Sequence, residues 1–157
     1  MSEKYGPGDG PAPRALTDEE LSALLGAQTF GTLATVKRSG HPHLSTVAYD
    51  WDARERVIRI STTEDRLKVR QIRNNPRVAL HVPGGNVWSF ATAEGDAGLS
   101  EVTTEPGDAV GRELLALTPG FPDPADERAF LEQMVQDRRL VVRMKVGRLY
   151  GTALDIS

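Results

Sequence analysis

The segment 60–80 holds the residues of this chain that are best suited to binding a ligand. Five cations lie between residues 66 and 77 with no acidic residue among them, although the whole chain carries a formal charge of −3. They are Arg66, Lys68, Arg70, Arg73 and Arg77. Ser61, Thr62 and Thr63 come shortly before these cations. Hydroxyl groups and free backbone N–H groups at a helix start, supported by lysine and arginine, bind phosphate or carboxylate. Most charge runs are solvated helix faces, but this placement favours an anion site.

The same segment predicts the elements that hold these groups. Arg56–Thr62 has the composition of a strand, and Arg77–Val82 predicts a second one. Between them we expect a short basic helix, which ends before Pro76 because proline cannot continue a helix. Ser61 and Thr62 could begin this helix as N-caps, a role that is compatible with binding an anion.

Hydrophobic periodicity predicts the remaining elements. Thr17 and Glu20 have the spacing of a capping box and predict a helix that begins at Thr17. Further strands are predicted at Phe30–Val36, His43–Asp50, Val87–Ser100 and Leu140–Leu149, and further helices at Pro106–Leu117 and Ala125–Arg139. About six strands, with hairpin-length links early in the chain and few helices, favour a mainly β (α+β) protein with an antiparallel barrel over a parallel α/β sheet.

Length and composition predict the domain organisation. Residues 1–14 contain three glycines and three prolines, so we expect a disordered tail that cannot bury enough apolar surface to become ordered. Residues 15–157 are expected to form a single domain, because a chain of 157 residues suits one hydrophobic core.

Several classes of function are excluded or disfavoured. The chain has no cysteine, which removes disulfides, thiol catalysis and cysteine-ligated metals. Its pI near 5.6 argues against broad binding of nucleic acid. No signal peptide and no apolar run of membrane-spanning length is visible, which predicts a cytoplasmic protein without membrane contact. His41 and His43 lack a chelating arrangement, so no metal site is expected. The chain also lacks nucleophile and phosphate-loop motifs, so an enzyme of this sequence would use a bound cofactor.

Three stretches, in this order and spacing, resemble one family. They are Gly31–Val36 with the following Gly40-His-Pro-His, the segment 61–80, and Ala93–Ser100. The chain resembles the pyridoxamine-phosphate-oxidase-like split-barrel flavoproteins over residues 17–154. Within them it is most similar to the actinobacterial reductases that use the deazaflavin coenzyme F420. The resemblance implies a split antiparallel β-barrel with peripheral helices. It also implies a homodimer whose cofactor lies at the subunit interface.

The resemblance also implies roles for individual residues. Ser61 and Thr62 take the places that line the cofactor, and Lys68 takes the place of the phosphate-binding lysine. The chain departs from true pyridoxamine-phosphate oxidases in three respects. It has Leu44-Ser-Thr-Val where they carry a phosphate-binding arginine, Leu67 where they place an arginine before the lysine, and no carboxy-terminal arginine-and-histidine segment. These departures favour coenzyme F420 over FMN.

Three more residues complete the predicted cofactor site. Arg59 shares a strand face with Val57 and Ser61 and could reach the same anion, or it could be an exposed strand arginine. Arg66 could bind the anion, or it could instead cap the helix or pair with Asp65. Thr46 could face the ring system of the cofactor or form a cross-strand hydroxyl pair. No catalytic side chain is identified.

Two hypotheses follow for the function. The first is an F420-dependent reductase that transfers a hydride from reduced coenzyme F420 to a conjugated small molecule, such as a biliverdin-like tetrapyrrole, a quinone or an unsaturated ketone or lactone. The alternatives are an FMN-dependent oxidoreductase of the same fold and a non-catalytic protein that binds a flavin, a deazaflavin or haem. Hydride transfer from a cofactor requires no diagnostic side chain, so the sequence does not separate them.

Overall fold

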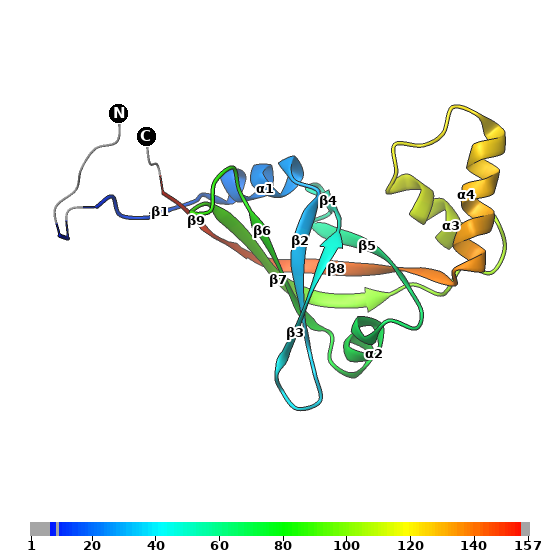
Figure 1. The fold of residues 1–157 in the computed structure, drawn as a ribbon, viewed down its shortest axis with the longest axis horizontal. Coiled ribbons are helices and arrows are strands. Elements are labelled where there is room, and N and C mark those ends of the chain that lie inside the picture. The colour runs from blue at the N-terminus through cyan, green and yellow to red at the C-terminus, as the bar shows by residue number, and fades with distance from the viewer. Residues whose placement is uncertain (1–6, 9, 155–157) are drawn as a thin grey trace.

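The computed structural model of the protein describes residues 7–8 and 10–154. Strands and helices alternate irregularly along the chain (Figure 1). The strands are β1 (Arg14–Ala15), β2 (Phe30–Val36), β3 (Pro42–Ala48), β4 (Asp50–Asp52), β5 (Val57–Thr63), β6 (Arg77–Pro83), β7 (Phe90–Leu99), β8 (Arg139–Tyr150) and β9 (Thr152–Ala153). The helices are α1 (Asp18–Ala27), α2 (Leu67–Asn74), α3 (Ala109–Ala116) and α4 (Pro124–Gln136). None of the described helices is long and apolar enough to cross a membrane.

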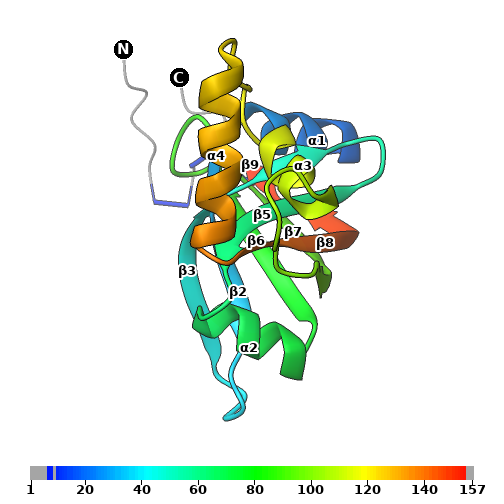
Figure 2. The same ribbon diagram turned by 90° about the vertical axis from the view of Figure 1, so that its right-hand side faces the viewer.

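Seven strands form one antiparallel sheet in the order β3-β2-β6-β7-β8-β5-β4. The sheet curls, and β3 at one edge contacts β5 near the other edge (Figure 2). The predicted fold class, a mainly antiparallel split barrel with peripheral helices, is confirmed. The strand number is higher than the predicted six, because β4 is a separate short strand and because β1 and β9 pair in a small second sheet.

The core lies inside the curled sheet. Alternate residues of each strand point inward, as in β5, where Ile58 and Ile60 are completely buried. Leu25 of α1 and Val69 of α2 join the same apolar cluster, so these helices cover open parts of the barrel. The capping box at the start of α1 forms as predicted: the Thr17 hydroxyl accepts a hydrogen bond from the Glu20 backbone, and the Glu20 carboxylate accepts one from the Thr17 backbone.

Helices α3 and α4 form a hairpin that interrupts the connection between β7 and β8. These two strands pair directly, so a short turn would be enough to join them. The hairpin has a small apolar cluster of its own, in which Leu114 and Met134 pack on Val141 of β8. It lies at the end of the molecule opposite to β1 and β9 (Figure 1). The buried residues of the hairpin thus form a cluster separate from the core of the barrel.

Some element boundaries differ from the sequence prediction. Helix α3 begins at Ala109 and not at Pro106, because the Asp108 carboxylate caps it and also accepts hydrogen bonds from the preceding turn. Strand β7 begins at Phe90, and Val87–Ser89 belong to a loop in which Asn86 accepts a hydrogen bond from the Trp88 backbone. The pairing of this strand with β8 contains a register shift between Glu94 and Gly95.

Half of the predicted tail 1–14 lies outside the described residues, which omit 1–6 and 9. Its last residue, Arg14, is part of β1 and pairs with Ala153. Its guanidinium group also forms a salt bridge with Glu20 at 2.9 Å. Disorder of residues 1–6 and 9 stays a prediction, as does the single domain that we expect from residue 15 onward.

Candidate functional site

The site is built along a free stretch of strand edge. Strand β4 pairs with β5 only at Val57–Arg59, so among the described strands none pairs with Ile60–Thr63 on that side. Strand β3 faces this stretch across a gap in the barrel. The backbone groups of a free strand edge are available to a ligand. The barrel is therefore split beside the end of β5, the strand that carries Ser61 and Thr62.

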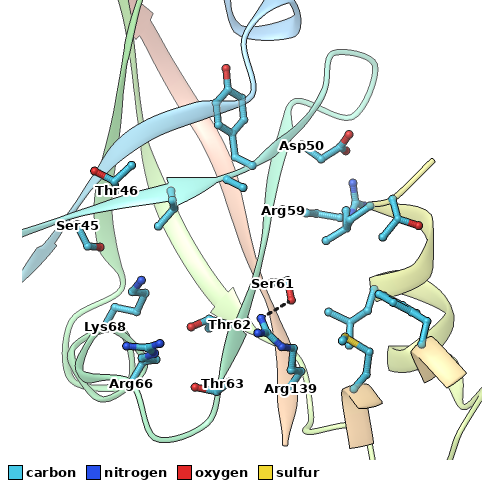
Figure 3. A pocket seen from close by; sticks show the side chains of 18 residues that line it. Ser45, Thr46, Asp50, Arg59, Ser61, Thr62, Thr63, Arg66, Lys68 and Arg139 are labelled. Atoms are coloured by element: carbon cyan, nitrogen blue, oxygen red, sulfur yellow. Dashed lines mark hydrogen bonds between the residues drawn. The ribbon is translucent and has the colours of Figure 1, made fainter. Parts of the chain in front are cut away.

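A cleft of about 600 Å³ occupies the split (Figure 3). Its walls come from β3, the end of β5, the start of α2, the α3–α4 hairpin and the start of β8. The lining residues are Ser45, Thr46, Val47, Ala48, Tyr49, Asp50, Arg59, Ser61, Thr62, Thr63, Arg66, Lys68, Leu114, Leu117, Thr118, Phe130, Met134 and Arg139. All six residues predicted from the sequence line this cleft: Thr46, Arg59, Ser61, Thr62, Arg66 and Lys68.

Lys68 and Arg66 give one side of the cleft its positive charge. Helix α2 buries Val69 and Ile72 in the core, which leaves the stem of Lys68 half-buried at the mouth of the barrel. Burial lowers the pKa of the Lys68 ammonium group, and the positive charge of Arg66 lowers it further. Arg66 is the N-cap residue of α2, but its side chain makes no capping hydrogen bond. An anion placed between these two groups would offset both the burial of Lys68 and the repulsion from Arg66.

The hydroxyl residues do not cap the helix as the sequence allowed. Ser61 and Thr62 lie within β5, four or more residues before the N-cap Arg66, so their expected capping role is wrong. The alternation of the strand separates them: the Thr62 side chain is buried, whereas that of Ser61 lies on the other face of the sheet. Thr63 is already engaged, because its hydroxyl donates a hydrogen bond to Asp65 at 2.7 Å.

Arg59 lies in a different part of the cleft from Lys68 (Figure 3). Its guanidinium group is 3.5 Å from the Asp52 carboxylate on β4 and 3.5 Å from the Glu113 carboxylate on α3. Glu113 also binds Arg143 of β8, with a shortest distance of 2.6 Å. These contacts attach α3 to the sheet and neutralise much of the Arg59 charge, so the structure gives Arg59 a structural task beside any contact with a ligand.

Thr46 is exposed on edge strand β3 and lies directly opposite Thr32 of β2 in the ladder. The register therefore permits the predicted cross-strand pair, and the lining of the cleft permits the predicted contact with a ligand. The outer cations of α2 behave differently. Arg70 and Arg73 are exposed and do not line the cleft, and Arg70 borders a separate shallow hollow with Arg38. The cations that the structure brings together are thus fewer than the sequence run suggested.

The pyridoxamine 5'-phosphate oxidase family model matches residues 17–150 of this chain. The chain belongs to this family. The predicted resemblance is thereby confirmed.

Solved structures similar to this family member include a deazaflavin enzyme. An F420 reductase is 26% identical, with 82% of this chain and 94% of that chain covered and a TM-score of 0.56. A conserved hypothetical protein from Mycobacterium tuberculosis is 22% identical, with 96% and 90% covered and a TM-score of 0.69. A FAD-binding protein from Mesorhizobium loti is 18% identical, with 91% and 97% covered and a TM-score of 0.58. The last two share the fold, and the set as a whole supports a flavin-type cofactor and an oxidoreductase activity.

Sequence reasoning missed the other side of the cleft in this family member. Arg139 begins β8, and its Nη1 atom donates a hydrogen bond to the Ser61 hydroxyl at 3.2 Å. The α3–α4 hairpin adds an apolar wall of Leu114, Leu117, Phe130 and Met134. These helical residues look like ordinary core positions in the sequence. Arg139 carried no such signal either, because only the pairing of β8 with β5 brings it beside Ser61.

Proposed function

We propose that the protein is a reductase that uses the reduced deazaflavin coenzyme F420 and transfers a hydride to a conjugated small molecule. The observation that carries the proposal is the half-buried Lys68 beside Arg66, at the end of a cleft along a free strand edge. A buried cation next to a second cation is unfavourable unless an anion joins them. The phosphate of a ribityl cofactor provides such an anion.

The residues present fit a cofactor of this kind. The cleft has a cationic end at Lys68 and Arg66, a polar edge at Ile60–Thr63 and an apolar wall from the helical hairpin. A flavin or deazaflavin matches the first two parts with its phosphate and the polar edge of its ring, and a second molecule stacked on its flat ring face would meet the apolar wall. In this arrangement Lys68 and Arg66 hold the phosphate, and the backbone of β5 orients the ring. The hairpin excludes water. The bound cofactor itself would supply the hydride chemistry.

Two observations favour coenzyme F420 over FMN. One solved structure similar to this chain is an F420 reductase. In addition, the stretch Leu44-Ser-Thr-Val stands where the FMN oxidases carry a phosphate-binding arginine, and β3 contributes no arginine to the cleft. The phosphate site therefore lacks one of the cations that would enclose a terminal phosphate. Such an open site suits a phosphate that continues into a charged tail, as in coenzyme F420. The acceptor classes remain those of the sequence analysis: a tetrapyrrole, a quinone or an unsaturated ketone or lactone.

We also propose a homodimer whose interface adjoins the cleft. Phe30 of β2 and Leu44 of β3 are 63% and 61% exposed and share one face of the sheet. Thr46 and Ala48 lie on the same face and also line the cleft. A second copy seated here would bury the exposed apolar side chains and complete the wall of the cleft. A Leu44→Glu variant that stays dimeric in light scattering, or a native protein that is a monomer and still binds cofactor, contradicts this arrangement.

The cofactor proposal is tested by titrating the purified protein with coenzyme F420 and with FMN under the same conditions. We expect tighter binding of F420, followed by oxidation of reduced F420 when a suitable acceptor is added. Equal or tighter binding of FMN would favour the FMN-dependent alternative. Tight F420 binding without turnover on a panel of acceptors would favour a non-catalytic carrier. A cytoplasmic location stays a prediction from the sequence and is tested by fractionation of cells.

A further inference from the structure

The cleft has a further cationic side chain, Arg139, which the proposed phosphate site at Lys68 and Arg66 does not use. Arg139 is half-buried at the start of β8, and its Nη1 atom donates a hydrogen bond to Ser61. Its Nε atom is buried and has no hydrogen-bond partner among the described residues. The nearest acidic group, the carboxylate of Asp137, lies 3.6 Å from this atom. A buried guanidinium N–H without an acceptor costs free energy. A bound ligand that gives this N–H group an acceptor would remove that cost.

Arg139 and Lys68 serve different sides of the cleft. Figure 3 shows Lys68 and Arg66 on the side of β5 that faces β3, and Arg139 on the side of the α3–α4 hairpin, with the Ser61 hydroxyl turned toward it. A phosphate at Lys68 therefore leaves Arg139 free for another group. The two cations therefore mark two parts of the cleft, one on each side of the end of β5.

The hairpin makes its part of the cleft apolar. Leu117 and Phe130 are half-buried, and they line the cleft beside the more deeply buried Leu114 and Met134. The ring of Phe121 packs 5.4 Å from that of Phe130, measured between centroids, and supports the aromatic edge of this wall. A flat apolar molecule gains contact area against such side chains.

We propose that Arg139 and the α3–α4 hairpin form the subsite for the hydride acceptor, and that the acceptor is a planar apolar molecule carrying a carboxylate. This inference rests on the proposed function, because it assigns the second part of the cleft to the second substrate. The guanidinium group of arginine matches a carboxylate with two parallel hydrogen bonds. Asp137 offsets part of the Arg139 charge, which favours a singly charged carboxylate over a doubly charged phosphate.

Direct binding of a matched pair of probes tests the subsite without any turnover. 2-Naphthoate and 2-naphthamide share one ring system and differ in charge, and each is titrated calorimetrically into the cofactor-free protein. We expect the native protein to bind the naphthoate more tightly than the amide. Arg139→Gln should weaken naphthoate binding by roughly tenfold to a hundredfold and leave the amide unchanged. Phe130→Ala should weaken the binding of both probes. Arg139→Lys should bind naphthoate with an affinity between those of the native protein and Arg139→Gln, and should bind the amide like the native protein.

Two controls separate this subsite from the cofactor site. Lys68→Met should leave naphthoate binding unchanged, and saturation with coenzyme F420 should not displace the probe. The proposal is overturned if Lys68→Met loses naphthoate binding while Arg139→Gln keeps it. It is also overturned if F420 displaces the probe. In either case the apolar wall of the α3–α4 hairpin would belong to the cofactor site. Absence of any preference for the acid over the amide overturns it too. Failure of F420 to bind at all would instead refute the proposed function, since the probe titration needs no cofactor.

Discussion

The pH dependence of cofactor binding offers a sharp test of the role of Lys68. Burial and the nearby Arg66 hold the pKa of the Lys68 ammonium group below its usual value of 10.5. The charged form is therefore less favourable in the folded protein than in the unfolded chain. This destabilisation is complete at neutral pH and is relieved as the pH rises from the lowered pKa toward 10.5. An anion bound beside Lys68 favours the charged form, so cofactor affinity should be constant near neutral pH and fall as the pH rises through the lowered pKa.

Substitutions at this position give the magnitude. A hydrogen bond to a charged group contributes about 1.5–3 kcal/mol, so Lys68→Met should weaken binding of coenzyme F420 roughly tenfold to a hundredfold at pH 7. Because the substitution removes a cation that burial disfavours, it should not lower the free energy of unfolding of the cofactor-free protein. Lys68→Arg keeps a charge that does not titrate in this range, so it should remove the fall in affinity at high pH.

The assay is a fluorescence titration of the three proteins with F420 at a series of pH values and constant ionic strength, with chemical denaturation measured on the same samples. Arg70→Met is a matched control, because Arg70 is a cation on the same helix but does not line the cleft. It should change affinity little. Native affinity in Lys68→Met removes Lys68 from the site. A fall at high pH that is the same in Lys68→Arg shows that another group titrates.

Two further predictions concern the elements that shape the cleft. A Cβ atom on Gly95 would overlap the carbonyl oxygen of Lys145, whereas one on Gly98 would lie 3.9 Å from its nearest neighbour. Gly95→Ala should therefore lower the free energy of unfolding, measured by urea denaturation, by about 1–3 kcal/mol. Gly98→Ala should lower it by much less. Although partial burial raises the pKa of Asp108, hydrogen bonds from the Thr103 hydroxyl and three backbone N–H groups lower it to about 2. The stabilising effect of its carboxylate should therefore be complete above pH 4 and be lost as the pH falls toward about 2. Asp108→Ala should abolish this loss of stability in acid and lower the free energy of unfolding by about 1 kcal/mol at pH 7. If the variant still loses stability in acid as the native protein does, another group is responsible.

Sequence patterns predicted those elements that carry local signals. The capping box at Thr17 and the proline after the basic helix fixed the ends of α1 and α2 to within a residue or two. Asp108 shows the limit of this approach. Its capping role depends on four hydrogen bonds within one turn, and the spacing of apolar residues alone placed the start of α3 three residues too early.

The candidate site was predictable on one side only. Lys68 and Arg66 stand out because their charges are concentrated in a short segment of an acidic chain. Arg139 does not stand out, since it is one of several cations near the end of α4 and becomes part of the site only through the pairing of β8 with β5. The partners of Arg59 were hidden for the same reason: Glu113 is distant in the sequence and reaches Arg59 only because the α3–α4 hairpin folds back over the sheet. Long-range pairing cannot be read from periodicity.

The position of β8 in the sheet also determines when the cleft can exist. Strand β5 pairs only with β4 and β8 among the described strands, so the β4–β5 hairpin has no strand pairing with β3, β2, β6 or β7 until Arg139–Tyr150 inserts between β7 and β5. Pairing between distant segments is slow because the intervening chain must first be closed into a loop. Formation of the cleft is therefore a late event in folding. During synthesis, β3, β2, β6 and β7 can pair with one another before β8 has been made, whereas β5 joins the sheet only when β8 pairs with it.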